Sequence, residues 1–153
     1  MTAFIIAHKL FLVPIIVLAT AQGIKFLRFT LRHGLNWDYA FAPGHFPSAH
    51  SAFVTSLVVM IGYYSGVESP AFAVATGFAI ITIYDAMRVR INIGLQGKTI
   101  NKLVATLDDI EHKEDFPKLK ERVGHYANEV AGGIAVGTIV SLLCIYYIES
   151  ILI

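Results

Sequence analysis

Residues 48–64 read SAHSAFVTSLVVMIGYY, an apolar run without a Lys, Arg, Asp or Glu that begins with small and polar residues. Its length approaches the roughly 20 residues that a helix needs to cross the hydrocarbon core of a bilayer. Residues 65–70, SGVESP, form a tight polar connection, because Gly, Ser and Pro interrupt regular structure. Residues 70–87 are again apolar, and the two runs together predict a transmembrane helical hairpin.

Two further apolar segments lie outside this hairpin, at residues 3–21 and 126–148. The first contains His8, Lys9 and Pro14, so a re-entrant or interfacial helix is an alternative for it. Hydrophobic residues make up 56% of the chain and charged residues only 15%, against about 25% in soluble domains. We therefore expect an all-α fold: a polytopic transmembrane helical bundle of about four membrane helices, as a single domain over residues 1–153.

The two long connections, residues 22–47 and 88–125, hold eleven of the twelve Lys and Arg residues. Four crossings place both connections on the same side, and the positive-inside rule makes that side cytoplasmic. We expect a multi-pass protein of the inner (plasma) membrane whose termini and 65–70 turn face outward. The net charge of +1 gives no indication of a nucleic-acid partner.

The second connection has structure of its own. Its TINKLVATL segment predicts a short amphipathic helix, and Gly94 and Gly97 before it predict a tight turn.

Three clusters of polar residues fall at membrane boundaries on the predicted cytoplasmic side. The first is Pro47-Ser48-Ala49-His50, which begins the second apolar run. The free amides of a helix N-terminus favour an anion, to which Ser48 adds a hydroxyl and His50 an imidazole. An ordinary helix cap is the alternative interpretation.

The second cluster is Arg122, His125 and Glu129, whose spacings of three and four predict one shared helical face. Glu129 is placed to accept the ring proton of His125 and fix its tautomer, which frees the other nitrogen to attack or to bind.

The third cluster contains Asp85 with Arg88 and Arg90, at the end of the third apolar run. Arginines that anchor the helix at the interface are the alternative. Lys25 and Arg32, which follow the first apolar segment, add a further basic pair.

Together these residues suit a phosphate ester, because its transfer needs charge neutralisation and a proton for the leaving oxygen. The sequence has no Walker-type glycine loop and no Cys/His set with zinc spacing. A metal site made of His50, His125 and Glu129 is the rival interpretation.

The chain resembles a known family. Lys25-x6-Arg32, Pro47-Ser48-Ala49-His50 and His125-x3-Glu129 resemble the three signatures of the type-2 phosphatidic acid phosphatases, a superfamily that includes the vanadium-dependent haloperoxidases. More closely, four segments resemble the divergent bacterial branch of that superfamily, over residues 21–137: PGHFPSAHSAFVTSL, YDAMRVR-x3-G-x-Q, INKLV and VGHYANEVAGG.

The resemblance implies a metal-independent reaction without a cofactor. His125 would be the nucleophile that forms a phosphohistidine, Glu129 would orient it, and His50 would protonate the leaving alcohol. The implied phosphate-binding residues are Ser48, the amide of Ala49, Lys25, Arg32, and one or both of Arg90 and Arg122, with Asp85 in support.

The chain departs from the usual signatures at several positions. His33 stands in place of the proline after Arg32, Ala49 in place of a glycine, and Glu129 in place of an aspartate. Leu119 occupies the place of the third-signature arginine, which Arg122 or Arg90 would have to replace.

Three functions remain open from the sequence. The first is a membrane lipid-phosphate phosphatase, acting on a phospholipid or a polyprenyl (pyro)phosphate. The second is a non-catalytic binder or translocator of lipid phosphates that uses the same pocket. The third is a scaffold or homo-oligomer, because Gly133 and Gly137 form a face that favours close helix packing.

Overall fold

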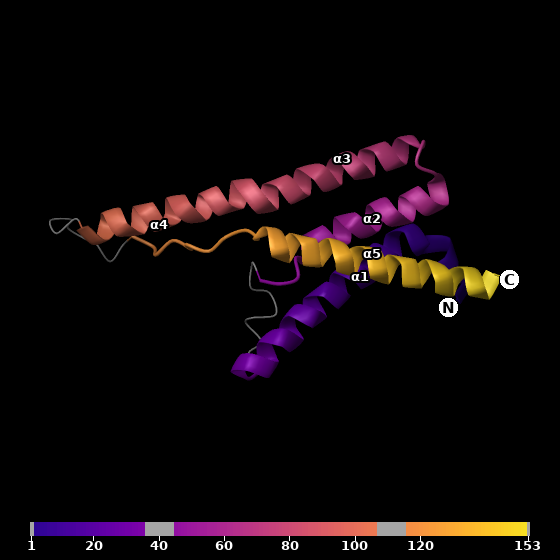
Figure 1. Ribbon diagram of the computed structural model, residues 1–153, viewed down its shortest axis with the longest axis horizontal. Helices are drawn as coiled ribbons and strands as arrows, with labels where there is room; N and C mark the ends of the chain where they lie inside the picture. Colours follow the sequence, from indigo (N-terminus) through magenta and orange to yellow (C-terminus); the bar gives the residue numbers. More distant parts are fainter. Residues whose placement is uncertain (1, 36–44, 107–115, 153) are drawn as a thin grey trace.

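The computed structural model describes residues 2–35, 45–106 and 116–152, and the regular structure in these ranges is entirely helical. In chain order the helices are α1 (Thr2–His33), α2 (Ala49–Ser65), α3 (Pro70–Tyr84), the π-helical segment η2 (Asp85–Val89), α4 (Arg90–Thr106) and α5 (Ala127–Leu152). Figure 1 shows them as an elongated bundle with one long projecting rod. The expected all-α membrane bundle is confirmed.

Three helical stretches among the described residues are long and apolar enough to cross a membrane: His8–His33, Pro70–Thr106 and Ala127–Leu152. The fourth predicted membrane helix, α2, has 17 residues and is not among these stretches. At 1.5 Å per residue it covers about 25 Å, close to the ~30 Å thickness of the hydrocarbon core. It packs against α1, α3 and α5, so it is the central helix of the bundle.

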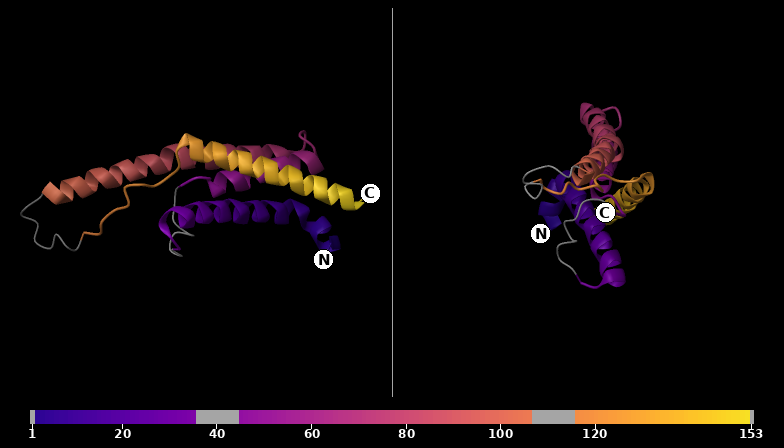
Figure 2. Two further views of the ribbon diagram at one scale, coloured as in Figure 1. Left: turned by 60° about the horizontal axis from the view of Figure 1, so that its bottom comes forward. Right: turned by 90° about the vertical axis from the view of Figure 1, so that its left-hand side faces the viewer.

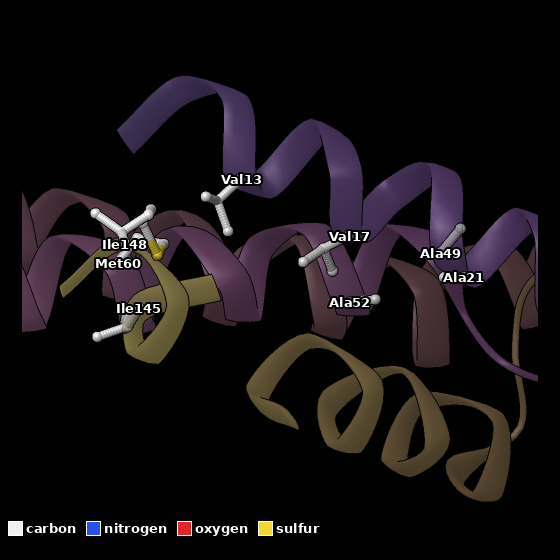
Figure 3. Close-up of a cluster of buried hydrophobic side chains, with 8 residues drawn as sticks. All are labelled: Val13, Val17, Ala21, Ala49, Ala52, Met60, Ile145 and Ile148. Carbon is white, nitrogen blue, oxygen red and sulfur yellow. The ribbon is translucent and has the colours of Figure 1, made fainter. Parts of the chain in front are cut away.

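Small residues let α5 approach α2 closely. A Cβ atom added at Gly133 would lie 2.3 Å from the carbonyl oxygen of Ser48, and one added at Gly137 would lie 2.5 Å from that of Ala52. The face predicted to favour helix packing is therefore used within one chain. Beyond it, α1, α2 and α5 share an apolar cluster, drawn in Figure 3. Its buried members are Val13, Val17, Ala21, Ala49, Ala52, Met60, Ile145 and Ile148.

The first helix is longer than the sequence predicted. It continues to His33 and ends at Gly34, whose φ of 83° and hydrogen bond to the carbonyl of Thr30 close the helix. Lys25 and Arg32 therefore lie within α1 instead of following it. At the other end α1 is kinked at His8.

The charge of Lys9 is accommodated by an aromatic ring. Its ammonium lies 3.6 Å from the centre of the Tyr64 ring, which gives this cation a partner at the end of the bundle.

The third apolar run also extends beyond its predicted end. Helices α3, η2 and α4 form one continuous rod of 37 residues, from Pro70 to Thr106. The rod is about 55 Å long by the ordinary helical rise. The turn predicted at Gly94 and Gly97 is wrong, because both lie inside α4. The predicted amphipathic segment is helical over its described residues, 99–106, and it is the end of this rod.

Both chain termini and the Gly66–Ser69 turn lie at one end of the bundle, as Figures 1 and 2 show. The first residues of α2 and α5 and the last of α3 are consequently at the opposite end. The predicted polar clusters begin those helices or follow α3, so the topology brings them to a common end.

Candidate functional site

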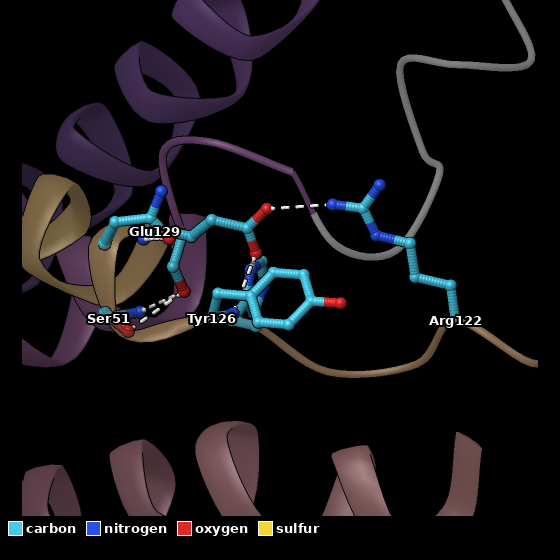
Figure 4. A network of polar contacts seen from close by, with 7 residues as sticks. Ser51, Arg122, Tyr126 and Glu129 are labelled. Carbon is cyan, nitrogen blue, oxygen red and sulfur yellow. Dashed lines mark hydrogen bonds and ion pairs between the residues drawn. The ribbon is translucent and has the colours of Figure 1, made fainter. Parts of the chain in front are cut away.

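The carboxylate of Glu129, in the first turn of α5, is the centre of a buried polar network (Figure 4). Its Oε2 atom lies 3.1 Å from Nδ1 of His125 and accepts a hydrogen bond from the backbone N–H of Tyr126 at 3.1 Å. Its Oε1 atom accepts one from Nη2 of Arg122 at 3.2 Å. Glu129 is only 4% exposed, and these donors supply the partners that a buried carboxylate needs.

The backbone geometry of this cluster differs from the predicted helical face. α5 begins at Ala127, so Arg122 and His125 lie in non-helical chain before it. The chain turns at Gly124, with φ of 93°, and the backbone N–H of His125 donates to the carbonyl of Ala86 in η2 at 3.0 Å. A main-chain anchor on η2, instead of helical periodicity, thus places His125 against Glu129.

The imidazole of His125 is 8% exposed. A carboxylate only accepts hydrogen bonds, so the neutral ring carries its proton on Nδ1 and leaves the lone pair of Nε2 free. Burial lowers the pKa of His125 below its usual value of about 6.5, while the Glu129 carboxylate acts in the opposite direction. The site therefore holds a neutral, oriented imidazole at neutral pH.

The N-terminus of α2 is joined to this network through the main chain. The backbone N–H of Ser48 donates to the carbonyl of Glu129 at 2.9 Å. Ser48 is fully buried, and its hydroxyl caps α2 by accepting from the backbone N–H and the hydroxyl of Ser51 at 3.3 and 2.9 Å. The structure gives Ser48 a capping role, and its phosphate-binding role stays a prediction.

The next two residues, Ala49 and His50, begin α2. Helix geometry provides no intrahelical partner for the first amides of α2, those of Ala49 and His50. The His50 side chain is exposed, and the charges that act on it are those of Arg90, Lys25 and Asp85. His50 and Lys25 in turn act on His125. Segments from four parts of the sequence therefore converge at one end of the bundle.

The third predicted cluster forms an ion pair. Nε of Arg90 lies 2.6 Å from Oδ2 of Asp85, and both side chains are partly exposed, at 46% and 37%. This pair orients the Arg90 guanidinium near the beginning of α2. Arg88, which is exposed, has no such contact among the residues that the structure describes.

The two basic residues of α1 have different environments. Lys25 is 6% exposed, whereas Arg32 is exposed. Both line a hollow of about 120 Å³, together with Arg28, Phe29, His33, His45 and Phe46. The Arg28 guanidinium lies 4.7 Å from the centre of the Phe46 ring. Lys25 belongs both to this basic hollow and to the surroundings of the two histidines.

The rival metal site is not supported by the geometry. Within residues 2–35, 45–106 and 116–152, no three His, Cys, Asp or Glu side chains are gathered closely enough to hold a metal ion. His50, His125 and Glu129 are therefore not arranged as a set of ligands.

Two main-chain contributions to the site could not be found from residue types, because main-chain groups carry no side-chain signal. They are the carbonyl of Ala86 and the amide of Tyr126, each of which holds a candidate residue in place. The hydroxyl of Ser51, which donates to that of Ser48, is a side chain that was not among the predicted site residues. Gly124 is the residue whose type indicates the turn, and this turn lets the main chain of His125 reach Ala86.

Comparisons with known proteins place the chain in a family. An uncharacterized membrane protein of Bacillus subtilis (strain 168), YuiD, is 37% identical over 138 residues, which cover 83% of this chain and 87% of that protein. No solved structure matches the chain. The model of the divergent PAP2 family, PAP2 being type-2 phosphatidic acid phosphatase, matches residues 6–140. The chain is thus a membrane protein that belongs to the divergent PAP2 family.

Proposed function

We propose that this chain is a lipid-phosphate phosphatase that acts through a phosphohistidine on His125. The observation that carries the proposal is the buried contact of 3.1 Å between Nδ1 of His125 and Glu129, which leaves Nε2 free. A nucleophile oriented by a third group is the usual arrangement in covalent catalysis. His50 and Lys25, whose charges reach His125, supply a second imidazole and a cation.

The proposed reaction has two steps. Nε2 of His125 attacks phosphorus, the N–P bond forms, the bond from phosphorus to the lipid oxygen breaks, and protonated His50 gives its proton to the leaving alcohol. Water then attacks phosphorus, His50 takes a proton from it, and the N–P bond breaks to release inorganic phosphate. Lys25, Arg90 and the amides of Ala49 and His50 would neutralise the phosphoryl oxygens.

A membrane lipid is the substrate class that the position of the site favours. Helix α5 begins at the site and is long and apolar enough to span a bilayer, so a head group would reach the site while its acyl or prenyl tail stays in the membrane. The concentration of Lys and Arg in residues 22–47 and 88–125 supports a cytoplasmic position in the plasma membrane.

Release of inorganic phosphate tests the proposal. Purified protein in nanodiscs is given phosphatidic acid, phosphatidylglycerol phosphate or a polyprenyl pyrophosphate. We expect release from at least one of them, lost in His125→Ala and retained in His8→Gln, a matched histidine change at the far end of α1. Release that His125→Ala leaves unchanged would exclude the proposed nucleophile.

A second function, binding or translocation of lipid phosphate without hydrolysis, is favoured by one observation. Both arginines proposed to replace the missing signature arginine are already paired, Arg122 with Glu129 and Arg90 with Asp85. This function predicts lipid binding by wild-type protein and by His125→Ala alike, together with no phosphate release. It also predicts weaker binding in Lys25→Gln.

A further inference from the structure

Residues 116–126 form a non-helical strap that returns from the end of α4 to the beginning of α5. Figures 1 and 2 show the strap running beside α4, outside the bundle of the other helices. Its last residues include Arg122 and His125, both part of the Glu129 network. Whatever holds the strap therefore also holds two members of the candidate site.

The far end of the strap is bound by the side chain of Asn101. Nδ2 of Asn101 donates to the carbonyl of Leu119 at 2.9 Å, and Oδ1 accepts from the backbone N–H of Leu119 at 3.0 Å. The same Nδ2 donates to Oε1 of Glu121 at 3.0 Å. An asparagine amide matches both main-chain groups of one residue, a pairing that neither an acid nor an aliphatic side chain reproduces.

The middle of the strap lies directly on α4, at two glycines one turn apart. A Cβ atom added at Gly94 would lie 2.6 Å from the carbonyl oxygen of Glu121, and one added at Gly97 would lie 2.8 Å from that of Lys120. The near end is anchored by the hydrogen bond from His125 to Ala86. The strap is thus in contact with the rod at three successive levels.

The two anchors hold both ends of the chain between them. Asn101 and Ala86 are fifteen residues apart on the rod, and their partners, Leu119 and His125, are six residues apart. The chain between the anchors bends at Glu121 and turns at Gly124. The place of Arg122 therefore depends on both anchors.

We propose that Asn101 is a positioning residue for the site, because its hydrogen bonds to Leu119 hold the strap against α4 and so fix where Arg122 and His125 lie. Asn101 does not touch a substrate; it acts through the strap. The proposal explains why α4 continues beyond the residues of the site. The expected effect of Asn101 on kcat rests on the proposed function. Its expected effects on hydrogen exchange at Leu119 and on the titration of His125 do not.

The test compares Asn101→Ala with Asn92→Ala, a matched control because Asn92 is an exposed asparagine of the same helix. In Asn101→Ala we expect faster hydrogen exchange at the Leu119 amide, on the order of tenfold for the loss of one such pairing. We also expect the imidazole of His125, followed by NMR in ¹⁵N-histidine-labelled protein, to titrate closer to its usual pKa. Asn92→Ala should match wild type in both measurements.

The catalytic readout is kcat on a lipid phosphate that the wild-type protein hydrolyses. Asn101→Ala should lower kcat on the order of tenfold or more, since small displacements of a nucleophile are costly. KM should change by less than about twofold, because the substrate contacts are intact.

A second variant keeps Asn101 and lengthens the chain between the two anchors by one glycine inserted between Lys120 and Glu121. It should retain slow exchange at Leu119 while showing the shifted His125 titration and the lower kcat. Wild-type exchange and wild-type His125 titration in Asn101→Ala would overturn the proposal, as would an unchanged titration in the insertion variant. If wild-type protein releases no phosphate, the proposed function fails, while exchange and titration still decide the role of Asn101.

Discussion

The backbone N–H of Ser48 donates a hydrogen bond to the backbone carbonyl of Glu129 across 2.9 Å. This bond joins α2, which carries His50, to α5, which carries the partner of His125, at the point where both helices begin. The relative position of the two imidazoles therefore depends on how closely these helices approach, and Gly133 sets that distance.

Gly133→Ala should force α5 away from α2, because the new Cβ would lie 2.3 Å from the Ser48 carbonyl oxygen. We expect the free energy of unfolding to fall by about 1–3 kcal/mol, as for other overpacked positions. Gly77→Ala in α3 is the control, since a Cβ there meets nothing within 4 Å. Denaturant unfolding in detergent measures both; equal stability of the two variants would refute the close packing.

Glu129→Gln keeps the size of the side chain but removes its charge. The amide no longer favours the Nδ1-protonated tautomer of His125 and cannot neutralise the imidazolium, so we expect kcat to fall on the order of 10²–10⁴-fold. Glu68→Gln, in the exposed turn at the far end, should be as active as wild type. An active Glu129→Gln would show that the carboxylate does not orient the nucleophile.

Arg122→Gln distinguishes two roles for this arginine. Its guanidinium binds Oε1 of Glu129 at 3.2 Å, so we expect it to hold the carboxylate that orients His125. This role predicts a lower kcat with little change in KM, whereas a phosphate-binding role predicts a higher KM. Steady-state kinetics on a lipid phosphate, with Lys118→Gln as the control for a nearby positive charge, measure the difference.

The buried His125 makes the stability of the protein depend on pH. Its pKa is lower in the folded than in the unfolded chain, so acid protonates the unfolded chain first. The contribution of the neutral ring is complete above pH ~6.5 and is lost as pH falls from there through the lower, folded pKa. The free energy of unfolding of wild type and of His125→Gln is measured between about pH 5 and 8. It should fall more steeply toward acid pH in wild type than in His125→Gln. Parallel curves would contradict the buried, neutral ring.

Hydropathy was enough to predict the membrane bundle, because a bilayer leaves few alternatives to a helix. Runs such as residues 48–64 and 126–148 nearly coincide with α2 and α5. Helix ends at the polar side were less predictable. No hydropathy signal marks where α1 ends beyond Lys25, and only Gly34 stops it.

The candidate site was predictable in its residue types and only partly in its geometry. His125, Glu129 and Arg122 meet as expected, yet the chain reaches this arrangement through Gly124 and a main-chain bond to Ala86. The prediction of a turn at Gly94 and Gly97 is wrong, because both glycines lie inside α4 and face the backbone of another segment. Sequence shows that a side chain is missing there, but not whether the freed space serves a bend or the approach of another segment.

The most direct test of the proposed mechanism is to trap its intermediate. Wild-type protein in nanodiscs is incubated with ³²P-labelled phosphatidic acid or polyprenyl pyrophosphate, quenched in alkali and mapped by peptide mass spectrometry. We predict an acid-labile, alkali-stable phosphoryl group on His125 that His125→Ala lacks. Phosphate released without a label on His125, or a label on another residue, would contradict the mechanism.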